Sequence, residues 1–190
     1  MTFLRQPTRA GVRDAAAKIA AILPPSPIFV QEINGTDIVF KAESLQPIGA
    51  FKLRGAWHRL TAMDEESRRR GAVAFSSGNH AQGIAWAARR LGIPATIVMP
   101  ADAPRAKVEG TLALGAEVVT YDRATESRET IAAALAEARG ATLVPSFDDP
   151  WVIEGQGSAG IEAAAQMAAA GLGEPTHAVV PCGGGGLSAR

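Results

Sequence analysis

Short apolar runs alternate with segments of helical periodicity through the middle of the chain. Four runs have the length of a strand, at 72–75, 95–99, 117–121 and 141–144, and three helical segments separate them, at 81–91, 107–114 and 125–139. Strands joined by helices of this length pair in parallel through right-handed crossovers. The pattern therefore predicts an α/β fold, with a parallel sheet covered by helices on both faces.

The segments on either side of this unit follow other patterns. They predict a helix at about 9–23, two short strands at 28–31 and 37–41, a helix at about 50–63, a long helix from 150 to about 170, and a last strand at 178–181. A proline run at 24–27 ends the first helix, and Asn34-Gly35 is a turn that joins hairpin strands. We predict a small α/β domain at 67–147, inserted into a larger domain made of 1–66 and 148–190.

Composition narrows the classes of partner. Of the 190 residues, 47% are hydrophobic, which is enough to bury a core, and 19 basic against 19 acidic residues give a formal charge of zero. Neither sign of charge forms a long run, so we expect no nucleic-acid or anionic-membrane partner. No apolar run approaches the roughly 20 residues of a membrane-spanning helix. These features favour a small-molecule partner.

Cys182 is the single cysteine of the chain. Its isolation excludes an internal disulfide and a thiolate-rich metal site. Residues 1–7 lack the apolar run of a signal peptide. We therefore predict a cytoplasmic protein without a metal site.

Lys52 is the strongest candidate for a reactive group. The chain has fifteen arginines but four lysines, and this lysine lies among Ala50, Phe51 and Leu53. Burial among apolar groups disfavours the ammonium form and exposes the lone pair of the neutral amine. Such an amine condenses with aldehydes. The alternative is an ordinary helix-starting lysine whose ammonium reaches water.

Two loops lie between a predicted strand and a helix start. The glycine run 183–186 precedes a helix expected from Leu187, so its amide hydrogens can turn inward and form a phosphate-sized anion site. The segment 76–80, Ser-Ser-Gly-Asn-His, presents amides and hydroxyls at a second helix start. A flexible connector and a capped turn are the respective alternatives. Neither loop has the glycine spacing of a nucleotide-binding motif.

A reactive amine, a phosphate site and a carboxylate-sized anion site together describe a pocket for pyridoxal phosphate and an amino acid. The blocks 41–46, 49–55, 76–83, 104–107 and 155–158 and the glycine run occur in one order along the chain. On these blocks the sequence resembles the fold-type II pyridoxal-phosphate enzymes, in the branch of threonine dehydratase, serine racemase and hydroxyaspartate dehydratase. This resemblance implies a two-domain, tryptophan synthase β-like architecture with parallel sheets, whose large domain is incomplete in this chain.

The resemblance also implies roles for individual residues. Lys52 would form the Schiff base with the cofactor, Phe51 would pack beside the ring, and Asn79 would hydrogen-bond the phenolic oxygen. The phosphate would be held by Gly183, Gly184, Gly185 and Gly186. The substrate carboxylate would be bound by Ser76, Ser77, Gly78, Asn79 and His80. Ser77 is also the candidate for a second acid or base, on the cofactor face opposite Lys52. His80 alternatively caps or packs the helix.

Three features depart from the family pattern. Ala50 stands where a serine usually precedes the Phe-Lys pair, and Ser146 follows Pro145 where asparagine is frequent. Family members also continue well past the glycine run, whereas this chain stops at Arg190. We therefore expect a fragment or an early-terminated product of a longer enzyme, whose full-length form is a homo-oligomer.

The predicted activity is that of a pyridoxal-phosphate-dependent ammonia-lyase. It would dehydrate L-threonine or L-serine to a 2-oxo acid and ammonia, with Lys52 abstracting the α-proton. Serine racemase and 3-hydroxyaspartate dehydratase are the alternatives that use the same pocket. Alternatives of other classes are a truncated, non-catalytic chain that binds phosphate or a partner, and a nucleotide-binding α/β domain.

Overall fold

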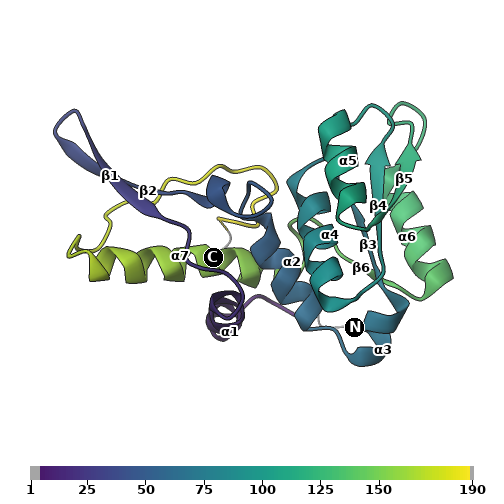
Figure 1. The fold of residues 1–190 in the computed structure, drawn as a ribbon, viewed down its shortest axis with the longest axis horizontal. Helices are drawn as coiled ribbons and strands as arrows, with labels where there is room; N and C mark the ends of the chain where they lie inside the picture. The colour runs from purple at the N-terminus through teal and green to yellow at the C-terminus, as the bar shows by residue number, and fades with distance from the viewer. Residues whose placement is uncertain (1–4, 189–190) are drawn as a thin grey trace.

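A four-stranded parallel sheet forms the middle of this computed structural model, which describes residues 5–188 (Figure 1). In spatial order the strands are β5 (Glu117–Tyr121), β4 (Ala95–Pro100), β3 (Ala72–Phe75) and β6 (Thr142–Leu143). The helices between them are α4 (Asn79–Leu91), α5 (Arg105–Ala113) and α6 (Arg128–Arg139). Every neighbouring pair of strands is parallel, which confirms the predicted fold class.

Alternation of side chains assigns the two faces of this sheet. Ala72 and Ala74 of β3 belong to the apolar core that includes α4, whereas Val73 packs with Ala132 and Ala136 of α6. Successive residues of a strand point to opposite faces, so a strand with a helix on each side is apolar at every position. Figure 1 shows α4 and α6 on opposite sides of the sheet.

The remaining elements lie outside the sheet, with the helix 65–70 at its lower end and the others on the far side of α4 (Figure 1). They are α1 (Arg9–Ala20), the antiparallel hairpin of β1 (Ile28–Ile33) and β2 (Thr36–Lys41), the 3₁₀ turn η1 (Glu43–Leu45), α2 (Lys52–Thr61), α3 (Glu65–Arg70) and α7 (Pro150–Ala169). Helix α2 packs against α4 on one side and against α7 on the other. The helix that begins with Lys52 is therefore enclosed by two others.

Helices α2 and α7 cross where each has a glycine. A Cβ on Gly155 would lie 2.4 Å from the Cα of Gly55, and a Cβ on Gly55 would lie 2.4 Å from Nε2 of Gln156. The amide of Gly55 also donates to Oε1 of Gln156 at 3.3 Å. The two backbones touch, so neither position has room for a side chain. This contact joins two of the sequence blocks that suggested the family, 49–55 and 155–158.

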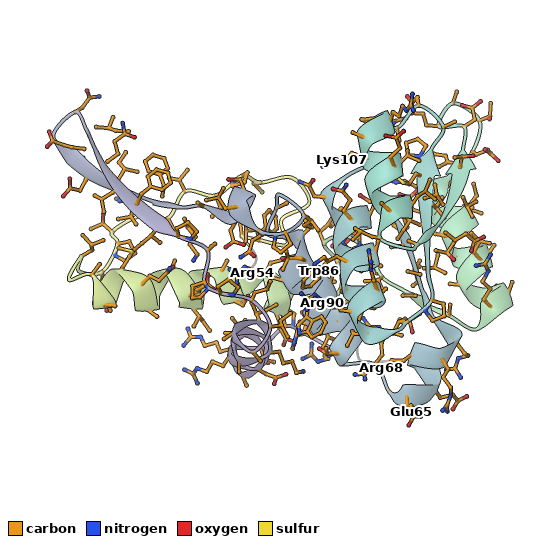
Figure 2. The ribbon with its side chains drawn as sticks, viewed as in Figure 1. Arg54, Glu65, Arg68, Trp86, Arg90 and Lys107 are labelled. Atoms are coloured by element: carbon orange, nitrogen blue, oxygen red, sulfur yellow. The ribbon has the colours of Figure 1, made fainter. Side chains whose placement is uncertain are left out.

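Arg54, labelled in Figure 2, joins three elements through a partly buried ion network. Its Nε and Nη2 each donate to the carboxylate of Glu43 at 2.7 Å, and its Nη1 and Nη2 donate to Glu162 at 3.1 and 2.9 Å. Arg54 itself is fully buried. Removing one partner of such a pair leaves an uncompensated charge and costs about 3–5 kcal/mol. The network therefore fixes η1, α2 and α7 relative to one another.

The prediction of a strand at 178–181 is wrong. These residues have no partner strand in the described chain, and Val179 is 98% exposed. An apolar run becomes a strand only where a neighbour satisfies its amides and carbonyls. The helix expected from Leu187 is represented by a turn at 186–188, and its continuation lies outside the described residues.

Other boundaries shift by a few residues. The first helix ends at Ala20 rather than at 23, and the helix predicted from 50 begins at Lys52. Among the described residues, no helix is both long and apolar enough to cross a membrane. The division into domains at 67 and 148 stays a prediction.

Candidate active site

The amine of Lys52 lies in a water-poor position at the start of α2. Its Nζ donates to the carbonyl oxygen of Ser146 at 2.9 Å and lies 5.3 Å from the centre of the Phe51 ring. Burial lowers the pKa of Lys52, because the ammonium form loses hydration. A larger fraction of the amine is therefore neutral and nucleophilic than in a lysine exposed to water.

The residue next to Ser146 connects this lysine to the glycine run. A Cβ on Gly184 would lie 2.2 Å from the ring of Phe147, and a Cβ on Gly186 would lie 3.2 Å from the Phe147 Cα. Gly185, with a φ of 82°, occupies the left-handed region that favours glycine. The glycine run thus lies against Phe147, one residue from the carbonyl that Lys52 binds. The structure brings these two predicted elements together.

The loop 76–80 lies between β3 and α4, as predicted. The amide of Ser76 donates to the Val98 carbonyl at 3.1 Å, which extends the ladder of the sheet. Gly78 is the N-cap residue of α4, and no side chain caps this helix start. Ser77 is half-buried in the loop. The amides at the start of α4 therefore stay available to an anion, as a carboxylate site requires.

Helix α4 also lies against the backbone of Lys52. A Cβ on Gly83 would lie 3.1 Å from both the carbonyl carbon and oxygen of Lys52. Contact this close places the first turns of α4 and the first turn of α2 side by side. The loop that ends at His80 and the amine of Lys52 thus belong to one region of the molecule.

His80 is buried and bonds to the sheet edge. Its Nε2 lies 3.0 Å from the carbonyl oxygen of Val144, an acceptor, so Nε2 carries the proton. Burial, with a smaller contribution from the charge of Lys52, lowers the pKa of His80 to about 4. His80 is therefore neutral at pH 7 and ties the first turn of α4 to the segment after β6.

Asn79 is exposed and bonds to a residue to which the sequence assigned no role. Its Oδ1 accepts a hydrogen bond from Nζ of Lys107 at 2.8 Å. Lys107 lies in the block 104–107 that contributed to the resemblance, and Phe147 lies in no block. Lysine is rare in this chain, which could have drawn attention to Lys107, but no local pattern indicated Phe147.

These positions fit pyridoxal phosphate. Lys52 offers its aldehyde an amine of lowered pKa, and open space lies where a Cβ would stand at Gly183 and Gly185, beside backbone amides suited to its phosphate. Asn79 lies at the start of α4, whose first turn contains no acidic residue to repel an anion. The individual roles of these residues stay predictions. The described residues contain no cluster of His, Cys, Asp and Glu able to hold a metal ion.

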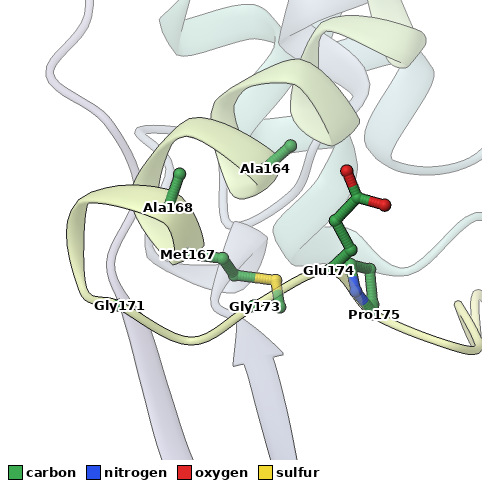
Figure 3. Close-up of a pocket in the computed structure, with 7 residues that line it drawn as sticks. All are labelled: Ala164, Met167, Ala168, Gly171, Gly173, Glu174 and Pro175. Carbon is green, nitrogen blue, oxygen red and sulfur yellow. The ribbon is translucent and has the colours of Figure 1, made fainter.

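A surface pocket elsewhere on the protein lacks groups that would bind an anionic cofactor. It lies between the end of α7 and the segment after it (Figure 3), and its lining includes Ala164, Met167, Gly171, Glu174 and Pro175. The lining is mostly apolar and its one charged side chain is a carboxylate. An anionic cofactor would therefore not be attracted there.

A parallel α/β sheet, a desolvated lysine and a glycine run beside it define a class of enzyme, in which a lysine captures a phosphorylated aldehyde. The family described as pyridoxal-phosphate dependent enzyme matches residues 23–189. The chain belongs to this family, and the predicted cofactor and family resemblance are confirmed.

Three relatives illustrate the range of activities in the family. The chain is 52% identical to an L-threo-3-hydroxyaspartate ammonia-lyase from a Pseudomonas species, over 78% of this chain and 48% of that protein. It is 41% identical to a serine racemase of Schizosaccharomyces pombe, over 95% and 56% of the two proteins. The crystal structure of a threonine deaminase from T.th. superposes with a TM-score of 0.85 at 42% identity, over 95% and 58% of the two chains. The chain thus spans about half the length of these relatives.

Proposed function

We propose that this chain carries the cofactor-binding part of a pyridoxal-phosphate-dependent ammonia-lyase that dehydrates L-threonine or L-serine to a 2-oxo acid and ammonia. The observation that carries the proposal is the amine of Lys52, whose pKa is lowered by burial. This amine donates to the carbonyl of Ser146, and the next residue, Phe147, contacts the glycine run. The membership of the family supports the cofactor.

Each part of the pocket has its own task in this proposal. Pyridoxal phosphate, when bound, supplies an electron sink that stabilises negative charge at the substrate α-carbon. Lys52 binds the cofactor and removes the α-proton, and the amides of the 76–80 loop bind the substrate carboxylate. The amides of 183–186 hold the phosphate. Ser77 is the proposed second acid or base on the opposite face.

A second candidate activity is favoured by a different observation. The 52%-identical relative is named an L-threo-3-hydroxyaspartate ammonia-lyase, and a second relative with this name, from Saccharomyces cerevisiae, is 43% identical over 95% of this chain. Hydroxyaspartate differs from threonine by a carboxylate in place of a methyl group, so both substrates would undergo the same elimination. Racemisation of serine is the third candidate, supported by the 41%-identical racemase.

The test of the cofactor site is a pair of lysine variants. Lys52→Ala should abolish turnover and the cofactor label that borohydride reduction fixes to the protein, because the amine that attacks the aldehyde is gone. Lys18→Ala is the matched control, since Lys18 is partly exposed on α1 and pairs with Asp14. Peptide mapping after reduction should locate the label at residue 52 in the parent protein. A label on another lysine, or turnover by Lys52→Ala, would contradict the assignment.

Substrate choice is tested on the purified parent protein. Formation of 2-oxo acid is measured with L-threonine, L-serine and L-threo-3-hydroxyaspartate at equal concentrations, and serine is recovered for chiral separation. The proposal expects the highest kcat/KM for threonine or serine. A higher value for hydroxyaspartate would select the second candidate, and D-serine without 2-oxo acid would select the third. A protein that binds phosphate but forms no covalent cofactor complex would be the non-catalytic alternative.

A further inference from the structure

Lys107 bridges two helices at the edge of the candidate site. It lies in the first turn of α5, and its Nζ donates to Oδ1 of Asn79 at 2.8 Å and to Oε1 of Gln82 at 3.2 Å. Asn79 and Gln82 are three positions apart and share one face of the first turn of α4. One ammonium therefore fixes two amide side chains at the start of this helix (Figure 2 labels Lys107).

The hydrogen bonds from Lys107 take the place of an N-terminal cap, which α4 lacks. Its N-cap residue, Gly78, makes no side-chain capping bond, and the backbone bond from the Gln82 amide to the Gly78 carbonyl is long at 3.4 Å. A capping side chain would occupy the amides that an anion needs. Holding the turn from outside, through Asn79 and Gln82, orders the turn and leaves those amides free.

The positive charge of Lys107 also favours an anion at the start of α4. A cation near a helix N-terminus is unfavourable, because that end of the helix is already positive. The first turns of α4 and α5 contain no acidic residue to compensate it. An anion bound in front of α4 would relieve this repulsion, so the position of Lys107 favours the charge of a carboxylate.

The chemistry of the ammonium fixes the orientation of the Asn79 amide. An ammonium has three donors and no acceptor, so the oxygen of Asn79 must face it and the NH₂ group must face away. Gln82 is fixed in the same way, with its Nε2 toward Gly110, where a Cβ would lie only 2.4 Å from it. Asn79 therefore offers a donor, rather than an acceptor, to a ligand of the site.

We propose that Lys107 is a positioning residue, which presents the NH₂ group of Asn79 as a donor to the phenolic oxygen of the cofactor. This inference rests on the proposed cofactor site. The phenolic oxygen is an acceptor when ionised, so a flipped Asn79 amide would oppose the ionised form and a fixed one stabilises it. Lys107 touches neither substrate nor cofactor in this role and acts through Asn79.

The experiment compares Lys107→Met, Lys107→Arg and Arg105→Met in the purified protein. Lys107→Met keeps the apolar stem but loses the donors, whereas Lys107→Arg keeps both donors and charge. Arg105→Met is the matched control, because Arg105 lies on the same helix and pairs only with exposed Glu109 among the described residues. The readouts are the borohydride-fixed label, the absorption spectrum of the bound cofactor, and kcat and KM.

Lys107→Met should keep the label at Lys52 but shift the cofactor spectrum toward the protonated phenol, and lower kcat/KM by about tenfold, the effect of one hydrogen bond to a charged group. Lys107→Arg should restore the spectrum, and Arg105→Met should leave spectrum and kinetics unchanged. An unshifted spectrum in Lys107→Met, or an equal loss in Arg105→Met, would overturn the assignment. Failure of the parent protein to form any label would instead refute the cofactor site itself.

A double-mutant cycle gives a second measurement that does not depend on the stability of Lys107→Met alone. If Lys107 acts through Asn79, adding Lys107→Arg or Lys107→Met to Asn79→Ala should change the spectrum no further. Additive spectral shifts would mean that Lys107 acts on the cofactor by another route, and would overturn the proposal.

Discussion

The four lysines differ in their hydrogen-bond partners, and these partners decide how readily each amine loses its proton. Lys18 and Lys41 each pair with a carboxylate, and Lys107 bonds to two amide oxygens. The Nζ of Lys52 donates to a backbone carbonyl, and burial lowers its pKa. A carboxylate partner would favour the ammonium form and suppress nucleophilic attack. Lys52 is thus the lysine whose surroundings suit covalent chemistry.

His80 makes the stability of the protein depend on pH. Its pKa is about 4 in the folded protein against 6.5 for the ordinary group, so between these values the unfolded chain binds a proton that the folded one excludes. Stability should therefore be full above pH 6.5 and fall as the pH drops toward 4, by up to about 3 kcal/mol for this group. Urea unfolding from pH 4.5 to 7.5 measures the slope.

His80→Gln should reduce this slope, because a neutral amide keeps a donor for Val144 and does not titrate. Buried His58 also has a lowered pKa, so part of the slope should remain. The control is His177→Gln, at an exposed position. An unchanged slope in His80→Gln, or an equal change in the control, would show that His80 is not buried in the neutral form.

Residue-scale prediction from the sequence succeeded where the chemistry is local. The apolar neighbours Phe51 and Leu53 indicated that Lys52 would lose hydration, and its lowered pKa agrees. The contact of Phe147 with the glycine run could not be predicted. That contact joins residues nearly forty positions apart, and an aromatic side chain in a loop carries no signal of its partner.

At the scale of elements, the crossing of α2 and α7 should be intolerant of any side chain. Gly155→Ala would place a Cβ 2.4 Å from the Gly55 Cα and should destabilise the protein by about 1–3 kcal/mol, since a backbone cannot move aside easily. Gly160→Ala is the control on the same helix, where a Cβ meets nothing within 4 Å. It should stabilise by up to about 1 kcal/mol through helix propensity.

Chemical denaturation of both variants measures these free energies. Equal effects of the two substitutions would mean that the helices do not cross at this point. A stable Gly155→Ala protein would also remove the packing explanation for glycine at position 155.

The elements that the sequence predicted best are those with a partner nearby in the chain. Strands β3 and β4 are joined by one helix and pair as expected. The run 178–181 has comparable β propensity yet forms no strand, because pairing requires a neighbour and the described residues provide none. Propensity is local, whereas a ladder of hydrogen bonds depends on the whole sheet.

At the scale of the whole molecule, the candidate site is assembled from distant segments. Lys52, the loop 76–80, the segment 144–147 and the glycine run 183–186 meet through the contacts described above. A ligand that bridges such segments binds the folded protein and not the unfolded chain. The cofactor should therefore stabilise the whole fold.

Pyridoxal phosphate at 100 times its Kd should stabilise the protein by about 2.7 kcal/mol, which corresponds to a rise in Tm of roughly 5 to 10 °C. Pyridoxal, which lacks the phosphate, should give a smaller rise, because the glycine run would contribute nothing. Lys52→Ala should retain part of the rise given by pyridoxal phosphate, from the phosphate alone. Differential scanning fluorimetry measures all three, and equal shifts with the two aldehydes would contradict the phosphate site.

The sequence by itself determined the α/β class, the order of most elements and the apolar surroundings that lower the pKa of Lys52. These features follow from hydrophobic periodicity, turn residues and the neighbours of one side chain, all of which are local. Only the tertiary structure decided that Phe147 lies against the glycine run, that Lys107 donates to Asn79, and that residues 178–181 stay unpaired in the described chain. Such contacts join residues far apart in the chain, so they depend on how whole elements pack rather than on any short pattern.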